Sequence, residues 1–277
     1  MFGRLFGAKT PILDSLPEVR GKYIENAKLA KHTWFGVGGP AEVLFLPEDA
    51  DDLKTFLMRK PAAIPVTVIG GGSNLLIRDG GIPGVVVKLD APAFRQVKFD
   101  GAEVMVGAGL KNSDLKKALI DNGVGGLEFI CSVPGRIGGL LRTNAGCFGK
   151  TVSDVFVRAH IMNDWGQIYE TGAEDFNFSY RSSMFPENWI VLDATLKGVK
   201  AAPEEIRKTM DEQLAYRLAH QPINKKTAGS TFKNPEGLQA WKLIKEAGCA
   251  GLKVGGAEVS DMHCNFLINR GKATAED

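Results

Sequence analysis

Short apolar runs rich in valine, isoleucine, leucine and phenylalanine recur along the chain, and such runs predict β-strands. They cover residues 41–47, 64–70, 84–89, 103–109, 155–162, 189–199 and 265–269. Apolar positions at helical spacing predict helices over residues 15–30, 47–60, 112–123, 203–220 and 238–248. Strands and helices in this mixed order indicate an α+β fold.

Residues 203–220 carry the clearest helix signal. Pro203, Glu204 and Glu205 stand at the start, where proline fits the first turn and acidic side chains meet the positive end of the helix dipole. From Gln221 onward the chain changes to a polar loop, so we expect a domain boundary near residue 200.

A glycine cluster, VIGGGSNLLI, occupies residues 68–77. Glycine is the default residue where φ must be positive, so a tight turn is one explanation. The other is an anion cradle, in which successive backbone N–H groups converge on a phosphate. A Rossmann fingerprint is excluded, because the chain returns to a strand instead of opening a helix. The cluster alone leaves turn and cradle equally open.

A second cluster, CSVPGRIGGLLRTNAGCFG, has five glycines within residues 131–149. Two such loops in one α+β chain favour a long ligand held from both sides. A dinucleotide with a central diphosphate has that length. Two unrelated loops are the alternative that the spacing leaves open.

Composition and charge limit the classes of molecule that the chain is expected to bind. The chain is 44% hydrophobic and 24% charged, as in ordinary soluble globular proteins. Its net charge of +2 creates no field for a polyanion, so we expect no nucleic-acid partner. No apolar run approaches the roughly 18 residues of a membrane span. The opening residues 1–14 contain too short an apolar run for a secretory signal.

The cysteines and histidines predict no metal site. Cys131, Cys147, Cys249 and Cys264 form no Cys-x-x-Cys pair, and this pattern is typical of reduced thiols in a cytoplasmic protein. The four histidines are dispersed and take part in no catalytic-triad or metal-ligand spacing.

Seven motifs occur in the order found in the UDP-N-acetylenolpyruvoylglucosamine reductase family, which the chain resembles from about residue 30 to its end. They are HTWFGVGGPAE (32–42), GGGSNLLIRDGG (70–81), VPGRIGG (133–139), NAGCFG (144–149), YRSS (180–183), AGSTFKNP (228–235) and GGAEVSDMHCNFLIN (255–269). The segment after YRSS has no large insertion, which resembles the shorter of the family's two types. The resemblance implies FAD as cofactor and NADPH as co-substrate in the synthesis of UDP-N-acetylmuramate for peptidoglycan.

The resemblance also implies a domain plan. It consists of two flavin-binding subdomains of the vanillyl-alcohol-oxidase (PCMH) type and a carboxy-terminal α+β domain for the substrate. Residues 1–200 would bind FAD, with subdomains at about 20–90 and 91–200, and residues 201–277 would bind the UDP-sugar enolpyruvate. We expect a monomer.

Residues matching the family motifs are expected to line the cofactor, mostly through backbone N–H groups. They are Gly70, Gly71, Gly72, Ser73, Asn74, Leu75, Val133, Pro134, Gly135, Ile137, Gly138, Gly139, Asn144, Ala145 and Gly146. Bare glycine amides suit a diphosphate, which accepts several hydrogen bonds at once.

Two further residues match catalytic positions of the family. Arg181 matches the arginine that faces the negative charge of the reaction intermediate, and its planar guanidinium suits a carboxylate. Ser230 matches the serine that donates a proton; a hydroxyl is a weak acid, but a carbanion-like centre is a very strong base. The residues expected to hold the sugar nucleotide are Tyr180, Arg217, Lys233 and Asn234.

Some positions depart from the family pattern. Arg136 stands where Ser or Thr is usual, and its charge could pair with the diphosphate or its bulk could obstruct it. His220 replaces a frequent lysine and puts one phosphate contact in doubt. Ser132 stands where glycine is common, and Glu258 where glutamine is common.

The last residues, NRGKATAED, resemble the beginning of a helix. In the family a helix and a final strand follow, and they carry a glutamate that works beside the arginine. That glutamate has no counterpart in residues 1–277, so we expect turnover by this chain to be severely impaired. A non-catalytic flavin- or nucleotide-binding homologue is the rival hypothesis, and an oxidase of the broader superfamily is a weaker one.

Overall fold

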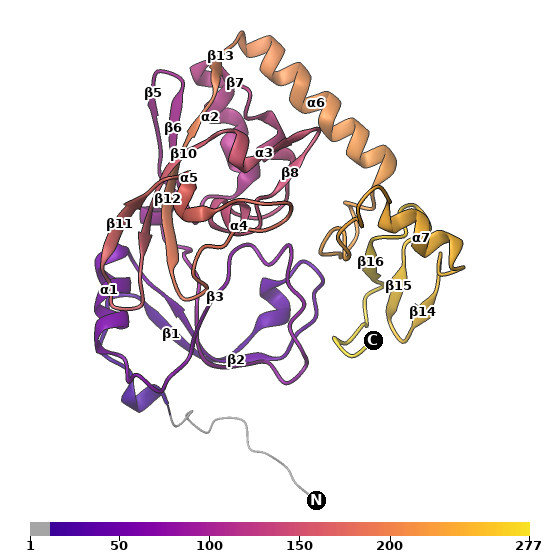
Figure 1. Ribbon diagram of the computed structural model, residues 1–277. Helices are drawn as coiled ribbons and strands as arrows, with labels where there is room; N and C mark the ends of the chain where they lie inside the picture. Colours follow the sequence, from indigo (N-terminus) through magenta and orange to yellow (C-terminus); the bar gives the residue numbers. More distant parts are fainter. Residues whose placement is uncertain (1–11) are drawn as a thin grey trace, which may run out of the picture.

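The computed structural model describes residues 12–277. In Figure 1, two sheet-containing lobes lie against each other, and one long helix leads from them to a smaller carboxy-terminal domain (residues 221–277). This combination of sheets and helices confirms the predicted α+β class. No helix within the described residues has both the length and the hydrophobicity needed to cross a lipid bilayer.

The first sheet has the strand order β1-β2-β4-β3. Its strands are β1 (Lys22–Lys28), β2 (Pro40–Leu46), β3 (Val66–Val68) and β4 (Ile82–Val87). β1 pairs with β2 in antiparallel fashion, whereas β2 and β3 both run parallel to β4. The parallel connection from β2 to β3 contains α1 (Ala50–Arg59), which Asp49 caps by accepting the N–H of Asp52 at 3.0 Å.

The helix predicted over residues 15–30 is wrong, because residues 22–28 form β1 and the rest of this stretch contains no α-helix. Burial alternates with a period of two along the strand, and Tyr23 pairs with Phe45 across to β2. The Tyr23 ring lies 5.1 Å from the Phe45 ring and 6.3 Å from the Phe56 ring. Cross-strand aromatic packing therefore outweighs the helical spacing of the charged residues.

The second sheet is antiparallel, with strand order β11-β10-β12-β6-β5. Its strands are β5 (Val97–Asp100), β6 (Glu103–Gly107), β10 (Phe156–Met162), β11 (Ile168–Thr171) and β12 (Ile190–Lys197). The lobe that contains this sheet also has four helices, α2 (Leu115–Asn122), α3 (Glu128–Ser132), α4 (Ile137–Arg142) and α5 (Ala173–Phe176). It has two separate strand pairs as well: β7 (Val124–Gly125) with β13 (Val199–Lys200), and β8 (Gly146–Cys147) with β9 (Lys150–Thr151).

A long helix, α6 (Pro203–His220), links these lobes to the carboxy-terminal domain and confirms the predicted span. The domain contains α7 (Ala240–Glu246) and a three-stranded antiparallel sheet of β14 (Lys253–Val254), β15 (Ala257–Val259) and β16 (Leu267–Asn269). Short 3-10 helices occur at Leu13–Ser15, Leu29–His32, Pro92–Phe94, Asn112–Asp114 and Val152–Asp154.

The main hydrophobic core joins the two lobes. Phe45 and Phe56 of the first lobe belong to the same buried cluster as Phe129, Leu115 and Phe176 of the second. A core that spans both lobes holds their facing loops in fixed positions. The predicted boundaries, 1–200 with a division near 90 and then 201–277, stay a proposal.

Candidate active site

Three parts of the chain meet around a cavity of about 570 Å³. Its walls come from the two glycine loops, from the segment between α5 and β12, and from the end of α6 with the carboxy-terminal domain. The sequence-predicted residues that line it are Gly70, Gly71, Gly72, Ser73, Asn74, Leu75, Val133, Pro134, Gly135, Gly138, Gly139, Ala145, Gly146, Tyr180, Arg181, Arg217, Ser230, Lys233 and Asn234.

The two glycine loops touch each other. The Ser73 hydroxyl donates a hydrogen bond to the carbonyl of Pro134 at 2.9 Å. A Cβ on Gly71 would lie 3.0 Å from the Cα of Gly135, so a side chain there would push the loops apart. The two loops expected to face one ligand are therefore neighbours in the fold.

Both loops present backbone N–H groups that have no acceptor within residues 12–277. These are the amides from Gly70 to Asn74 in the first loop and those of Gly135, Arg136 and Gly139 in the second. Half-buried amides need acceptors, and a diphosphate offers several oxygens at once. A Cβ on Gly70 or Gly139 would project into open space. The residues present therefore fit a cofactor that contains a diphosphate.

Two of the predicted cofactor residues lie outside the cavity lining. Ile137 is fully buried, and its N–H donates to the carbonyl of Leu110 at 3.2 Å. The side chain of Asn144 donates to the carbonyl of Ser179 at 3.0 Å and accepts the N–H of Ser153 at 3.1 Å. Ile137 thus anchors its loop to the core, and Asn144 ties its loop to the turn that contains Arg181.

Arg181 lies at the tip of a tight turn. Ser179 and Ser182 exchange backbone hydrogen bonds of 3.0 and 3.1 Å on either side of Tyr180 and Arg181. Arg181 has a φ of 56°, a left-handed conformation that is uncommon for arginine. Its exposed guanidinium faces the cavity and has no hydrogen-bond or ion-pair partner in the described chain.

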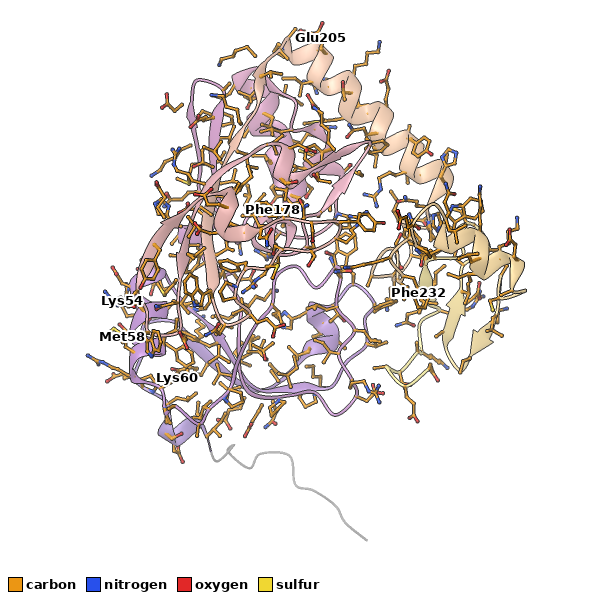
Figure 2. All side chains as sticks on the ribbon, in the orientation of Figure 1. Lys54, Met58, Lys60, Phe178, Glu205 and Phe232 are labelled. Carbon is orange, nitrogen blue, oxygen red and sulfur yellow. The ribbon has the colours of Figure 1, made fainter. Side chains whose placement is uncertain are left out.

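Ser230 belongs to a second wall, where it forms an isolated β-bridge with Phe266. Asn265 fixes this segment: its side chain accepts the N–H of Phe232 and donates to the carbonyl of Phe232, both at 2.9 Å. Phe232, labelled in Figure 2, marks the position of the segment in the carboxy-terminal domain. The Ser230 hydroxyl is bonded to no other group in residues 12–277 and is therefore available to a ligand.

The remaining predicted residues surround these two walls. The phenol oxygen of Tyr180 accepts the N–H of Asn234 at 3.4 Å, which joins the Arg181 turn to the Ser230 segment. Arg217 donates from Nε to Gln221 at 2.9 Å, and burial lowers the pKa of its guanidinium from the ordinary value. Lys233 is exposed.

Arg136 lines the cavity, but its guanidinium is already engaged by protein groups. Its guanidinium is buried and hydrogen-bonds to Asp90 and to the carbonyl of Gly109. Lys88 lies 3.1 Å from Asp90 and 3.1 Å from Nδ1 of His32. Burial alone would raise the pKa of Asp90, but Lys88 and Arg136 outweigh it and hold that pKa below its ordinary value.

The structure adds Arg142, for which the sequence analysis predicted no role. Arg142 lines the cavity and donates to the carbonyls of Phe185 and Glu187 at 2.9 Å each, and to that of Trp189. Its guanidinium lies 4.2 Å above the Phe185 ring, and burial lowers its pKa to about 10. Arg142 therefore fastens the segment before β12 to the second glycine loop. A charged residue ending an otherwise apolar helix is its one sequence signal.

Two family models match this chain. One is described as UDP-N-acetylenolpyruvoylglucosamine reductase, C-terminal domain, and matches residues 221–277. The other is described as FAD binding domain and matches residues 41–172. The first match includes Ser230, Lys233 and Asn234, and the second includes both glycine loops.

Curated relatives extend the similarity over nearly the whole chain. The chain is 48% identical to the UDP-N-acetylenolpyruvoylglucosamine reductase of Bradyrhizobium sp. (strain ORS 278), over 97% of this chain and 88% of that protein. It is 49% identical to the protein of the same name from Paramagnetospirillum magneticum, over 95% of this chain and 86% of that protein.

A solved structure agrees. The crystal structure of UDP-N-acetylenolpyruvylglucosamine reductase from Thermus caldophilus superposes with a TM-score of 0.82 at 34% identity, covering 94% of this chain and 92% of that one. With the FAD-binding model, this match confirms the predicted flavin-binding fold followed by a further α+β domain.

Proposed function

The chain belongs to the UDP-N-acetylenolpyruvoylglucosamine reductase family, and we propose that it reduces UDP-N-acetylglucosamine enolpyruvate to UDP-N-acetylmuramate with FAD and NADPH. As a member of this family it is a flavin-dependent oxidoreductase of peptidoglycan synthesis. Its free thiols favour a place in the cytoplasm.

One observation carries the proposal: both glycine loops, Arg181 and Ser230 line the same cavity. These residues come from segments far apart in the sequence. A protein that only bound a flavin would need the loops but would have no use for a free guanidinium and a free hydroxyl beside them.

The loops supply the cofactor site. The free N–H groups from Gly70 to Asn74 and of Gly135, Arg136 and Gly139 would hold the diphosphate of FAD. Bound there, FAD would accept a hydride from NADPH and supply it to the alkene of the enolpyruvyl group. Leu89, Leu140 and Val191 also line the cavity and give it apolar surface.

Arg181 would stabilise negative charge on the substrate. Hydride addition to the terminal alkene carbon places charge on the neighbouring carbon and on the carboxylate oxygens. A guanidinium with no protein partner can donate to both carboxylate oxygens at once. The left-handed backbone of Arg181 fixes the side chain at the tip of its turn, so little reorganisation is needed as the charge develops.

Ser230 would complete the reduction by proton transfer. The proton on its Oγ would move to the carbon next to the carboxylate, the stronger base of the pair. Asn265 holds the backbone of Phe232 from both sides and keeps the Ser230 segment in place.

The sugar nucleotide would extend along the remaining wall. Arg217 and Lys233 provide positive charge for its diphosphate. Tyr180 and Asn234, already in contact at 3.4 Å, would shape the place where the sugar lies.

Separate half-reactions test the proposal. The purified protein, loaded with FAD, is mixed anaerobically with NADPH and then with UDP-N-acetylglucosamine enolpyruvate. We expect the flavin absorbance to bleach and then to recover slowly, in keeping with the impaired turnover expected above, with UDP-N-acetylmuramate detected by mass spectrometry. In Arg181→Ala the flavin should be reduced by NADPH at the normal rate. Its absorbance should recover about a hundredfold more slowly, as when one donor to a developing oxyanion is lost. Bleaching without recovery in the unaltered protein would instead favour a binding protein on this scaffold.

A further inference from the structure

The carboxy-terminal domain touches the first lobe at a point separate from α6. Asn269, buried at the end of β16, donates from Nδ2 to the carbonyl of Phe35 at 2.7 Å. Its Oδ1 accepts the N–H groups of Gly271 at 2.6 Å and Ala273 at 3.1 Å. The Asn269 side chain therefore stabilises the loop after β16 through its oxygen and binds the first lobe through its nitrogen.

Asp79 makes a second contact between the same two parts. Its two carboxylate oxygens accept the N–H groups of Ala275 at 3.0 Å and Glu276 at 3.1 Å. Asp79 itself is exposed and lies in the loop that leads into β4. A carboxylate that accepts two successive amides fixes both the position and the direction of that backbone.

Within the carboxy-terminal domain, Asn269 is also hydrogen-bonded to the segment that contains Ser230. The N–H of Asn269 donates to the carbonyl of Lys226 at 2.9 Å, and Lys226 begins the segment that reaches Ser230. A Cβ on Gly36, next to Phe35, would lie 3.3 Å from the Lys226 side chain.

Within the first lobe, the residue next to Phe35 is hydrogen-bonded to the first glycine loop. Phe35 follows Trp34, whose N–H donates to the carbonyl of Gly72 at 2.9 Å. A short series of hydrogen bonds thus runs from the loop expected to hold the diphosphate to the segment with the expected proton donor.

We propose that Asn269 and Asp79 form an interdomain clasp that sets the position of Ser230 relative to the cofactor loops. The inference rests on the proposed function. The clasp fixes the carboxy-terminal domain to the first lobe, whereas α6 and the 3.4 Å contact between Asn234 and Tyr180 attach it to the second. Asn269 and Asp79 are positioning residues, since neither lines the cavity.

Two substitutions remove the clasp without emptying the core. Asn269→Asp keeps the oxygen that Gly271 and Ala273 require but loses the donor to Phe35. Asp79→Ala changes an exposed side chain, so the fold is retained. Asp175→Ala is the matched control, because Asp175 is an exposed carboxylate that accepts the N–H of Gly172 at 3.0 Å in the second lobe.

The half-reactions distinguish positioning from general damage. We expect both clasp variants to bind FAD and to be reduced by NADPH at the rate of the unaltered protein. Flavin reoxidation by the enolpyruvyl sugar nucleotide should slow at least tenfold, because misplacement of about 1 Å can cost two orders of magnitude in rate. Asp175→Ala should change neither step. Unchanged reoxidation in both clasp variants, or an equal loss in both half-reactions, would overturn the clasp.

Hydrogen exchange tests the contact independently of activity. The amides of Ala275 and Glu276 should exchange faster in Asp79→Ala, and the segment 226–231 should lose protection in both variants. Unchanged protection there would refute the clasp even if the enolpyruvyl sugar nucleotide proved not to be a substrate. Failure of the unaltered protein to be reoxidised, with the protection changes present, would refute the proposed function alone.

Discussion

The hydroxyl of Ser73 donates to the carbonyl of Pro134 at 2.9 Å, and this bond joins two glycine loops that are about sixty residues apart in the sequence. Gly71 and Gly135 meet beside it, so neither loop can move without the other. The free amides of both loops consequently form one surface.

Gly70→Ala should weaken FAD binding while leaving the flavin-free protein as stable as before. The new methyl group would meet no protein atom within 4 Å and would project into the cavity. A steric cost of about 1.4 kcal/mol on the bound ligand corresponds to a tenfold weaker affinity. Fluorescence titration of the deflavinated protein measures the affinity.

Gly80→Ala is the matched control, because Gly80 is exposed, has no heavy atom within 4 Å of the position of its Cβ, and lies outside the cavity. Equal affinities for FAD in the two variants would show that the space over Gly70 does not receive the cofactor.

Ser230→Ala should slow flavin reoxidation by the enolpyruvyl substrate by about 10²- to 10⁴-fold, the usual contribution of a positioned general acid. FAD content and reduction by NADPH should not change, because the Ser230 hydroxyl makes no hydrogen bond within residues 12–277 that its loss would break. Stopped-flow absorbance under anaerobic conditions separates the two steps. Ser113→Ala, an exposed serine outside the cavity, should match the unaltered protein in both.

Asn144→Gly should displace Arg181 without preventing the protein from folding. Asn144 has a φ of 40°, which glycine adopts readily, but glycine cannot bind the carbonyl of Ser179 or the N–H of Ser153. We expect the KM for the sugar nucleotide to rise about tenfold, as for the loss of roughly 1.4 kcal/mol, with FAD still bound. A KM within twofold of the original would mean that the turn is held by its own two serines.

Asp90→Asn should lower the free energy of unfolding by about 3 kcal/mol, because Arg136 would stay buried without its carboxylate. The effect should depend on pH. The folded-state pKa of Asp90 is depressed, so its contribution is complete above the unfolded pKa of about 4 and is lost as pH falls through the lower folded value.

Urea titrations at pH 7 and in the acid range measure this difference, and the two proteins should converge at low pH. Asp211→Asn is the control: Asp211 pairs with Lys116 at 3.0 Å on the surface, and such pairs contribute at most about 1 kcal/mol. A constant difference between Asp90→Asn and the unaltered protein at all pH values would exclude the ion pair as its source.

The sequence predicted elements best where their signals are local. Pro203 with its acidic neighbours set the start of α6, and Gly123, with a φ of 59°, ends α2 as expected. The helix prediction for residues 15–30 failed. The strand that forms there depends on Tyr23 packing against the rings of Phe45 in β2 and Phe56 in α1, and local spacing does not reveal such contacts.

The same contrast applies to the candidate site. Motifs located the glycine loops, Arg181 and Ser230, and these line one cavity. They could not indicate that Arg136 turns to Asp90, or that Arg142 binds carbonyls of residues 185–189, since the partners lie more than forty residues away in the sequence. Nor could they distinguish Ile137 and Gly138, whose amides donate to the carbonyls of Leu110 and Ala108, from Gly139, whose amide has no acceptor within residues 12–277.

The contact between Ser73 and Pro134 has a consequence for the order of events during synthesis. Both partners are synthesised before residues 221–277, and so are the strands that support them. A nascent chain can therefore bring its two glycine loops together while the carboxy-terminal domain is still being translated, and the wall that contains Ser230 is added last.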